Sequence, residues 1–533
     1  ATLWSGNDEA DWLGWLGVIE RSRLQLETLH DFAREVRDDG ITRVVLLGMG
    51  GSSMAPEVIR ETFGVQPGYP DLLVLDSTNP AEILAVDNAI DPGRTLFIVS
   101  SKSGSSLEPN ILMDFFLERV SAVTGVESAG RHFIAITDPG TSLDTLAGER
   151  NFRRIFHGEP SIGGRFSALS NFGLVPAALI GVDCARLLES ARILAEACSP
   201  DAAIEDNPGV QLGCYMGAGA LNGRDKLTLV LPLGLAALGA WLEQLVAESS
   251  GKLGKGIIPV DGERTGAPSD YGDDRVFVCM HLEDAPDLQQ QQAVAALAAA
   301  GQPVAQVGFT DIYELGGAFF YWQIATAVAG SIIGVNPFDQ PDVEASKVEA
   351  RRITAACEAG NPLSDGTALA DDGVISVYTD AANAAVLKAA CGEDVSVAGL
   401  IRAHLARLGA GDYFGLLAYL HRNESNNGYL DAIRHRVRKS HGVATCVGFG
   451  PRFLHSTGQA YKGGANNGVF LQLTADTVRD THIPGRVCSF GVITAAQAHG
   501  DFEVMAARGR RILRIHLGAE ADAGLERLEE YIT

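Results

Sequence analysis

The chain has 533 residues, of which 46% are hydrophobic and 20% are charged. This length exceeds the size at which one hydrophobic core keeps growing, so we expect two or three domains with large cores. The formal charge of −24 argues against a nucleic-acid or anionic-membrane partner, because phosphate-rich surfaces attract basic proteins.

The cysteines and the apolar runs indicate in which cellular compartment the protein is expected. Eight cysteines stand singly without a CxxC pair, so neither a zinc site nor a redox dithiol is indicated. Single cysteines in apolar runs suit a reducing environment. No basic and apolar leader opens the chain, and the longest apolar run, Leu227 to Leu242, contains prolines and glycines and predicts a strand followed by a helix. We therefore expect a cytoplasmic protein without a membrane span.

Strand and helix patterns alternate over the first third of the chain, which is typical of a parallel sheet covered by helices on both faces. Short β-branched or apolar runs predict strands at 43–47, 72–76, 95–100 and 132–137. Amphipathic segments between them predict helices. Residues 1–185 are therefore expected to form a doubly wound α/β domain.

Two more domains are expected after residue 185. Residues 186–358 read as a second α/β unit, with strands at 227–231 and 303–308 and helices over Ala236–Glu248 and Gln289–Ala300. The turn cluster Gly360-Asn361-Pro362 then marks a change of pattern. The third domain, residues 359–533, is expected to be of α+β type, with strands at 374–378, 413–419, 443–448, 469–473 and 511–516.

A glycine-rich segment, Gly48-Met-Gly-Gly-Ser-Ser53, separates the first predicted strand from the helix pattern after it. Glycines let the backbone approach an oxyanion closely, and a helix start presents free amide groups. The spacing matches neither the dinucleotide fingerprint nor the Walker loop. The segment is either a plain tight turn or part of an anion site.

A serine-rich segment, Ser101-Lys-Ser-Gly-Ser-Ser-Leu-Glu108, follows the third predicted strand. Its hydroxyls and its ammonium group suit the oxygens of a phosphate, since nearly all of them donate hydrogen bonds. A solvated loop is the alternative. Ligands of open α/β sheets bind at the carboxyl ends of strands, which favours the phosphate site.

Three further segments are weak when each is taken alone, since a lone arginine, glutamate or lysine is usually a surface or salt-bridge residue. They are Gly163-Gly-Arg-Phe-Ser167, Gln244-Leu-Val-Ala-Glu-Ser-Ser-Gly-Lys252 and Asn336-Pro-Phe-Asp-Gln-Pro-Asp-Val-Glu-Ala-Ser-Lys347. Together and in this order, the glycine-rich and serine-rich segments and these three resemble the phosphoglucose isomerases, which are built from two sugar-isomerase (SIS) domains.

The resemblance covers most of residues 40–350. Gly450-Pro-Arg-Phe-Leu-His-Ser-Thr-Gly-Gln459 with Lys462-Gly-Gly464 extends it into the third domain, where it is similar to the isomerase module fused to transaldolase in some bacteria. The resemblance implies an α/β fold with two doubly wound SIS-type domains plus a C-terminal α+β domain. It also implies a sugar-phosphate substrate, a homodimer, and a reaction that needs no metal or other cofactor.

The resemblance also implies roles for individual residues. Glu248 matches the base that moves a proton between the first two sugar carbons, and Arg165 matches the arginine that stabilises the enediolate anion. Lys347 matches one of the two groups that open the sugar ring. The residues expected to hold the phosphate are Gly51, Ser52, Ser101, Ser103 and Ser106, with Lys102 either adding charge or pointing outward.

The second ring-opening group is normally a histidine, and here the chain departs from the family. The corresponding region, Glu314-Leu-Gly-Gly-Ala-Phe-Phe-Tyr-Trp322, contains no histidine. Our hypothesis is that His455 of the third domain replaces it, since His455 lies at a predicted strand end beside Gly458 and Lys462. The alternative is a histidine that is hydrogen-bonded inside a core turn.

The resemblance therefore implies a glucose-6-phosphate isomerase that acts through a cis-enediolate. A sugar-phosphate-binding sensor would keep the serine segment but would not need Glu248, Arg165 and Lys347 together, and no basic helix-turn-helix pattern is visible. An isomerase that also accepts mannose 6-phosphate stays open. A non-catalytic relative is disfavoured by the three intact residues.

Overall fold

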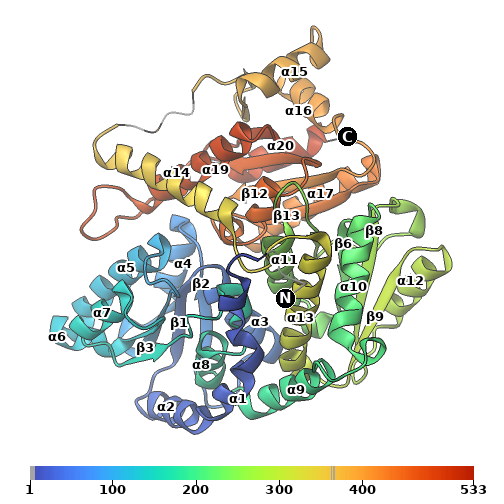
Figure 1. The fold of residues 1–533 in the computed structure, drawn as a ribbon. Helices are drawn as coiled ribbons and strands as arrows, with labels where there is room; N and C mark the ends of the chain where they lie inside the picture. The colour runs from blue at the N-terminus through green and yellow to red at the C-terminus, as the bar shows by residue number, and fades with distance from the viewer. Residues whose placement is uncertain (1–5, 362, 364–365, 533) are drawn as a thin grey trace.

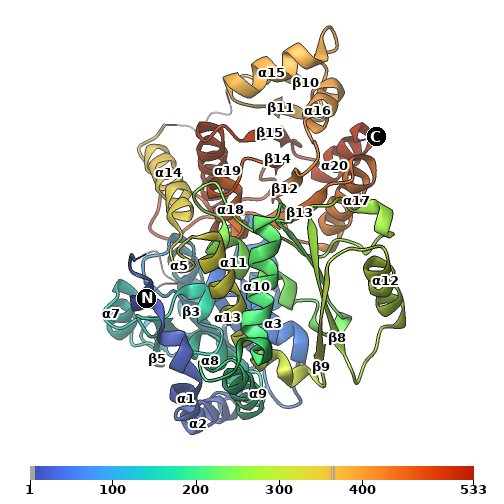
Figure 2. The same ribbon diagram turned by 45° about the vertical axis from the view of Figure 1, so that its right-hand side comes forward.

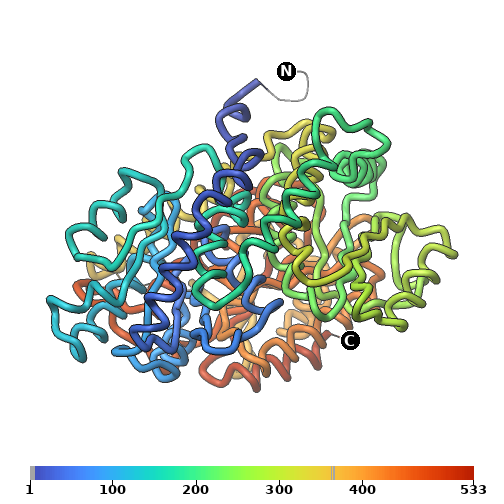
Figure 3. Tube along the Cα trace, turned by 90° about the horizontal axis from the view of Figure 1, so that it is seen from below, coloured from blue at the N-terminus to red at the C-terminus, as the bar shows by residue number. Residues whose placement is uncertain are grey.

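The computed structural model describes residues 6–361, 363 and 366–532, which form three sheets covered by helices. Figure 1 shows the first sheet at the lower left, the second at the lower right and the third above both. Seen from below, the first two units lie side by side in front of the third (Figure 3). Pro362 of the expected turn cluster lies outside the described residues.

The first sheet is parallel, with the strand order β2-β1-β3-β4-β5. Alternate residues of β1 point to opposite faces: Val44 and Leu46 join one core cluster, and Val45 and Leu47 join another. The strands are β1 Arg43–Gly48, β2 Asp71–Leu75, β3 Thr95–Ser100, β4 Phe133–Thr137 and β5 Arg154–His157. The helices are α1 Val18–Arg23, α2 Leu26–Asp38, α3 Met54–Phe63, α4 Pro80–Ala89, α5 Leu107–Thr124, α6 Val126–Ala129, α7 Ser142–Glu149 and α8 Asn171–Leu179. The unit is therefore doubly wound.

The second sheet is also parallel, with the order β7-β6-β8-β9. Its strands are β6 Lys226–Val230, β7 Ile258–Val260, β8 Arg275–Leu282 and β9 Val304–Phe309. Its helices are α9 Cys184–Ala197, α10 Pro208–Leu221, α11 Leu238–Ser250, α12 Leu288–Ala299 and α13 Leu315–Ile333. A separate small core, with Phe277 and Leu297, lies under α12.

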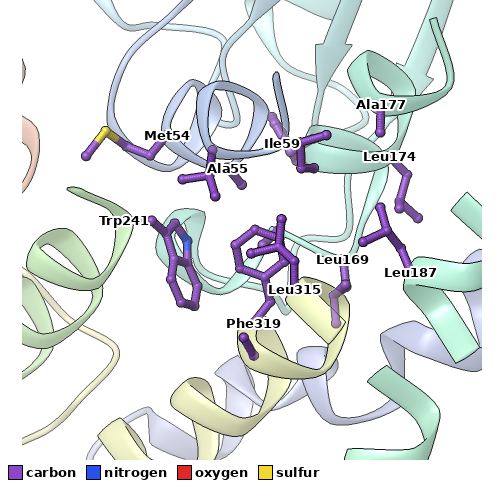
Figure 4. Close-up of a cluster of buried hydrophobic side chains, with 14 of the residues drawn as sticks. Met54, Ala55, Ile59, Leu169, Leu174, Ala177, Leu187, Trp241, Leu315 and Phe319 are labelled. Atoms are coloured by element: carbon purple, nitrogen blue, oxygen red, sulfur yellow. The ribbon is translucent and has the colours of Figure 1, made fainter. Parts of the chain in front are cut away.

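One hydrophobic core joins the first two units. Figure 4 shows Met54, Ala55 and Ile59 of α3 facing Trp241 of α11 and Phe319 of α13. Trp241 and Phe319 contact each other edge to face, with ring centroids 4.9 Å apart. Because the core is continuous, α3 and α11 have a fixed relative position, and each of them borders the site described below.

The third sheet has the order β10-β11-β15-β14-β12-β13 and mixes strand directions. Four neighbouring strands are parallel, and β11 pairs antiparallel with β10 and β15. Its strands are β10 Ala370–Asp371, β11 Ser376–Tyr378, β12 Tyr413–Tyr419, β13 Ala444–Phe449, β14 Gly468–Thr474 and β15 Arg511–His516. Its helices are α15 Ala381–Cys391, α16 Val397–Leu405, α17 Glu424–His441, α18 Gly458–Gly463, α19 Phe490–Ala507 and α20 Ala521–Tyr531. The expected α+β unit thus has a parallel centre like the other two sheets.

Helix α14, Pro341–Glu358, leads from the second sheet to the third and lies against α19 (Figure 2). The approach is close: a Cβ placed on Gly500 of α19 would lie 2.9 Å from the backbone nitrogen of Ala350. One face of the third sheet also meets the second unit, where Ala247, Ile258 and Val260 share a core with Phe453 and Tyr461. The third unit is therefore packed on the other two.

One helix of the second unit is more apolar than the sequence-based expectation allowed for. Within the described residues, Ile312–Ile333, which includes α13, is long and apolar enough to cross a membrane. However, 78% of its most apolar window is buried inside the molecule, next to Trp241 and α10. The segment is therefore packed as a core helix.

The strand predictions are confirmed, with ends shifted by no more than two residues. Four strands were not predicted: β5, β7, β8 and β10. Strand β7 has only three residues, and its centre is Pro259, which lowers strand propensity. Strand β8 begins with Arg275, whose side chain is fully buried against Glu263. A charged residue at the start of a run does not indicate a buried strand, so this one was not predicted.

Candidate active site

The two serine- and glycine-rich loops lie side by side at the carboxyl edge of the first sheet. Strands β1 and β3 are parallel neighbours, and Gly48 pairs in register with Ser100. The Ser100 hydroxyl, at the end of β3, donates a hydrogen bond of 3.0 Å to the Ser52 carbonyl in the loop after β1. The expected phosphate-binding residues are therefore brought to one edge.

The side chains of these residues differ in how free they are. The Ser101 hydroxyl is buried and has no hydrogen-bond partner among the described residues. Ser106 is the N-cap of α5, but its side chain does not cap the helix. The Ser103 hydroxyl lies 3.0 Å from that of Ser105. A buried hydroxyl and an unused cap position suit an oxyanion ligand.

Lys102 is already paired. Its ammonium group donates to Asp138 and lies 5.9 Å from the centre of the Trp12 ring. The charge of Lys102 is therefore paired with Asp138 within the protein, which differs from both alternatives that the sequence left open.

Gly51 brings the glycine-rich loop into contact with the segment that carries Arg165. A Cβ at position 51 would lie 2.2 Å from the carbonyl of Gly164 and 2.7 Å from the backbone nitrogen of Arg165. Arg165 belongs to the short 3-10 helix η6, Gly164–Phe166. Only glycine allows this approach.

Arg165 is buried, and its guanidinium group donates hydrogen bonds to four acceptors. It donates to Ser249 Oγ at 2.7 Å and to Gln340 Oε1 at 2.8 Å, and to the carbonyls of Pro337 and Asp339 at 2.6 and 3.1 Å. Its Nη1 also lies 3.5 Å from Glu248 Oε1. The guanidinium group is therefore fixed beside the carboxylate of Glu248, which lies near the end of α11.

Lys252 supports this arrangement through the loop before α14. It does not pair with Glu248; its ammonium group donates to the carbonyls of Asn336 and Asp339 and, at 2.6 Å, to Asp339 Oδ1. Burial and the charge of Arg165 lower the pKa of Lys252 to about 8. Lys252 thus anchors the loop whose carbonyls hold Arg165.

His455 reaches the first unit from the third. Its Nε2 lies 3.0 Å from Glu108 Oε1, and both side chains are buried. Gln497 of α19 donates to the same oxygen at 2.7 Å. Burial alone would raise the pKa of Glu108, but His455, backbone donors and Lys347 outweigh it and lower that pKa to about 2. Glu108 is therefore a carboxylate that orients His455.

Gln244 links this pair to Glu248. Its amide nitrogen donates to Glu248 Oε2 at 3.1 Å and to the carbonyl of His455 at 3.0 Å. Gly50 packs directly against His455, since a Cβ at position 50 would lie 2.8 Å from the His455 carbonyl. The φ of Gly50, 55°, is one that glycine adopts readily. The glycine loop, Glu248 and His455 thus form one contact network.

Lys347 lies on α14, close enough to Glu108 to lower its pKa. Its side chain is 33% exposed, and its ion pair with Glu344 is long, at 3.9 Å. Gln459 of α18 fixes the start of α14 by accepting from the backbone nitrogens of Asp342 and Val343 at 2.9 and 3.1 Å. The ammonium group of Lys347 therefore remains accessible at the rim of the site.

Four residues of this network had no role in the sequence-based prediction: Glu108, Gln244, Lys252 and Gln497. The first three lie within the segments that carried the family resemblance. Their positions in those segments could have marked them as site residues. Gln497 lies in an alanine-rich helix of the third unit. Nothing in its local sequence points to Glu108.

Comparison with known proteins identifies the family of the chain. A family model for phosphoglucose isomerase matches residues 25–267. The chain is 31% identical over 386 residues to a glucose-6-phosphate isomerase of Rubrobacter xylanophilus, covering 63% of this chain and 87% of that protein. It is 27% identical over 399 residues to a protein of the same name from Parabacteroides distasonis, covering 65% of this chain and 88% of that one.

Solved structures share the fold. A hypothetical protein of Thermus thermophilus matches with a TM-score of 0.58 and 27% identity, over 65% of this chain and 91% of that one. A glucose-6-phosphate isomerase of Chlamydia trachomatis matches with a TM-score of 0.55 and 22% identity, over 64% of this chain and 75% of that one. The chain belongs to the phosphoglucose isomerase family.

Proposed function

We propose that this chain is a glucose-6-phosphate isomerase, which interconverts glucose 6-phosphate and fructose 6-phosphate through a cis-enediolate. The observation that carries the proposal is the contact between Arg165 and Glu248, a fixed guanidinium 3.5 Å from a buried carboxylate. The names of the two bacterial relatives support the same reaction.

Ring opening is the first step. It requires a group that takes the proton of the C1 hydroxyl and a group that protonates the ring oxygen. We assign this step to His455 and Lys347. The hydrogen bond from His455 to Glu108, at 3.0 Å, supports the assignment, because a carboxylate behind an imidazole fixes its orientation and stabilises its protonated form.

The hydrogen transfer follows. We assign to Glu248 the removal of the proton from C2 and its return to C1, because one carboxylate can accept and release that proton without leaving its place. The hydrogen bond from Gln244 to Glu248 Oε2 leaves the other oxygen, Oε1, on the side of Arg165. Arg165 would stabilise the enediolate anion, a contribution of roughly 3 kcal/mol for a preorganised donor.

Phosphate binding positions the open-chain sugar. We assign it to Ser101, Ser103 and Ser106, together with the backbone of Gly51 and the backbone and hydroxyl of Ser52. The buried Ser101 hydroxyl without a partner among the described residues supports this. Binding energy from this remote group can be used to orient the reacting carbons.

We also propose the finer points of the resemblance. Likeness to the isomerase module fused to transaldolase rests on the segment from Gly450 to Gln459, which contains His455. We propose division into units at 185 and 358, a cytoplasmic setting and a homodimer. The four proposed catalytic groups all come from one chain, so a second chain would not be needed to supply them.

The deciding experiment is a coupled assay of fructose 6-phosphate turnover, with the wild type beside Glu248→Gln. We expect an active wild type and a loss on the order of 10²- to 10⁴-fold in the variant, the usual range for a general base. Glu283→Gln, which alters an exposed glutamate, is the matched control and should stay active. A wild type that binds sugar phosphates without turning them over would contradict the proposal and point to a sensor.

A further inference from the structure

The third sheet has its own topological switch point. Strand β12 is bordered by β13 on one side and by β14 on the other, and all three are parallel. The chain therefore leaves β12 toward one side and returns toward the other. In open α/β sheets, ligands bind in the crevice outside the carboxyl ends of strands at such a point.

A cavity of about 540 Å³ lies at this place. It is bordered by the loop after β12, which includes His421 and Asn423, and by residues 475–479 after β14. His516 at the end of β15 and Asn79 at the start of α4 complete the border. A volume of this size is in the range of small-molecule sites.

One residue that lines this cavity carries a buried acceptor without a partner among the described residues. Asn426, which lines it, is 5% exposed. Its amide nitrogen donates to the His421 carbonyl at 2.7 Å, whereas its Oδ1 is buried and has no partner among the described residues. A buried oxygen without a donor is costly, so a ligand group that donates a hydrogen bond would be favoured here.

The charges at the border disfavour an anion. Three carboxylates line the cavity, those of Asp476, Glu520 and Asp522, and one guanidinium, that of Arg479. Asp476 accepts from His516 at 3.2 Å. Carboxylates and amide oxygens are acceptors, which pair with hydroxyl donors and repel phosphate.

Part of the wall is apolar. Tyr419, Pro80, Ala495 and Ala498 line the cavity between the polar loops. A sugar ring or a nucleobase has a face that packs on such a wall while its hydroxyls reach the acceptors. We propose that this cavity binds an uncharged, hydroxyl-rich molecule with one apolar face, namely a sugar that is either free or part of a nucleoside.

The test is binding of glucose and of adenosine to the full chain, measured by saturation-transfer NMR. Either probe should bind the wild type, and the stronger one identifies the source of the sugar. Ala475→Trp, which fills the cavity, should weaken binding at least about tenfold. Ala385→Trp changes an exposed alanine of α15 in the same unit and should leave binding unchanged.

A second variant guards against misfolding. Asp476→Ala removes an exposed acceptor at the border and should also weaken binding without altering the thermal midpoint of the fold. The proposal is overturned if neither probe binds at millimolar concentration, if binding is equally strong in Ala475→Trp, or if inorganic phosphate displaces the probe.

Discussion

The Nε2 atom of His455 lies 3.0 Å from Oε1 of Glu108, although the two residues are 347 positions apart. Both side chains are buried, and the bond joins the third unit to the first helix turn after the serine loop. Gln244 extends the contact to Glu248, because its amide nitrogen donates both to Glu248 and to the His455 carbonyl.

Removing His455 should affect ring opening specifically. We expect His455→Ala to lower turnover of the cyclic sugar phosphate on the order of 10²-fold or more, with a much smaller effect on an open-chain substrate. Glu108→Gln should lower it in the same direction, because the amide no longer stabilises a protonated imidazole. Equal losses on cyclic and open-chain substrates would rule out this role.

A methyl group at position 51 should disturb Arg165. Gly51→Ala puts a Cβ within 2.2 Å of the Gly164 carbonyl, so the segment carrying Arg165 must move. A displacement near 1 Å at a catalytic group costs on the order of 10²-fold in kcat. Gly148→Ala is the matched control in the same unit, since a Cβ there meets nothing within 4 Å. Unchanged kcat in Gly51→Ala would show that Arg165 tolerates the shift.

The pH dependence of stability should contain a contribution from Glu243. This residue lines a cavity of about 460 Å³ between α3, α11 and the third unit, together with Asp261, Arg434 and Arg452. Burial and the charge of Asp261 raise the pKa of Glu243 from 4.5 to about 8, against the opposing effect of the arginines.

Between these two pH values the folded chain holds a proton that the unfolded chain has lost, so the free energy of unfolding falls as pH rises. Glu243→Gln should remove this fall, worth at least about 1 kcal/mol between pH 5 and pH 8. Urea unfolding at both pH values measures it. Glu61→Gln, an exposed neighbour in the same cavity, should keep the wild-type slope.

The buried ion pair of Lys462 and Asp501 should be sensitive to the loss of one partner. The two side chains are fully buried, and Nζ lies 2.7 Å from Oδ1. Lys462→Met leaves an uncompensated carboxylate and should destabilise the fold by about 3–5 kcal/mol.

The double variant Lys462→Met with Asp501→Asn should recover part of that loss, because no buried charge remains. Lys439→Met, at an exposed position, serves as the control. Denaturant unfolding measures all of these. A single variant as stable as the wild type would mean that water or another group neutralises Asp501.

The sequence predicted local features well and distant contacts poorly. Strands such as β1 and β12 were predictable because their apolar runs end at glycines or polar turns. Strand β5, at the edge of the sheet, was not predictable, because Arg153 precedes it and Arg154 begins it. The bond between Glu108 and His455 depends on how the third unit packs on the first, and no local pattern encodes that packing.

The distribution of the proposed catalytic groups over three sheets has a consequence for thermal inactivation. Arg165 belongs to the first unit, Glu248 to the second and His455 to the third. Any loosening between units separates these groups while each sheet stays intact. On heating, catalysis should therefore fail at a lower temperature than secondary structure, and cooling should restore it as long as the units find one another again.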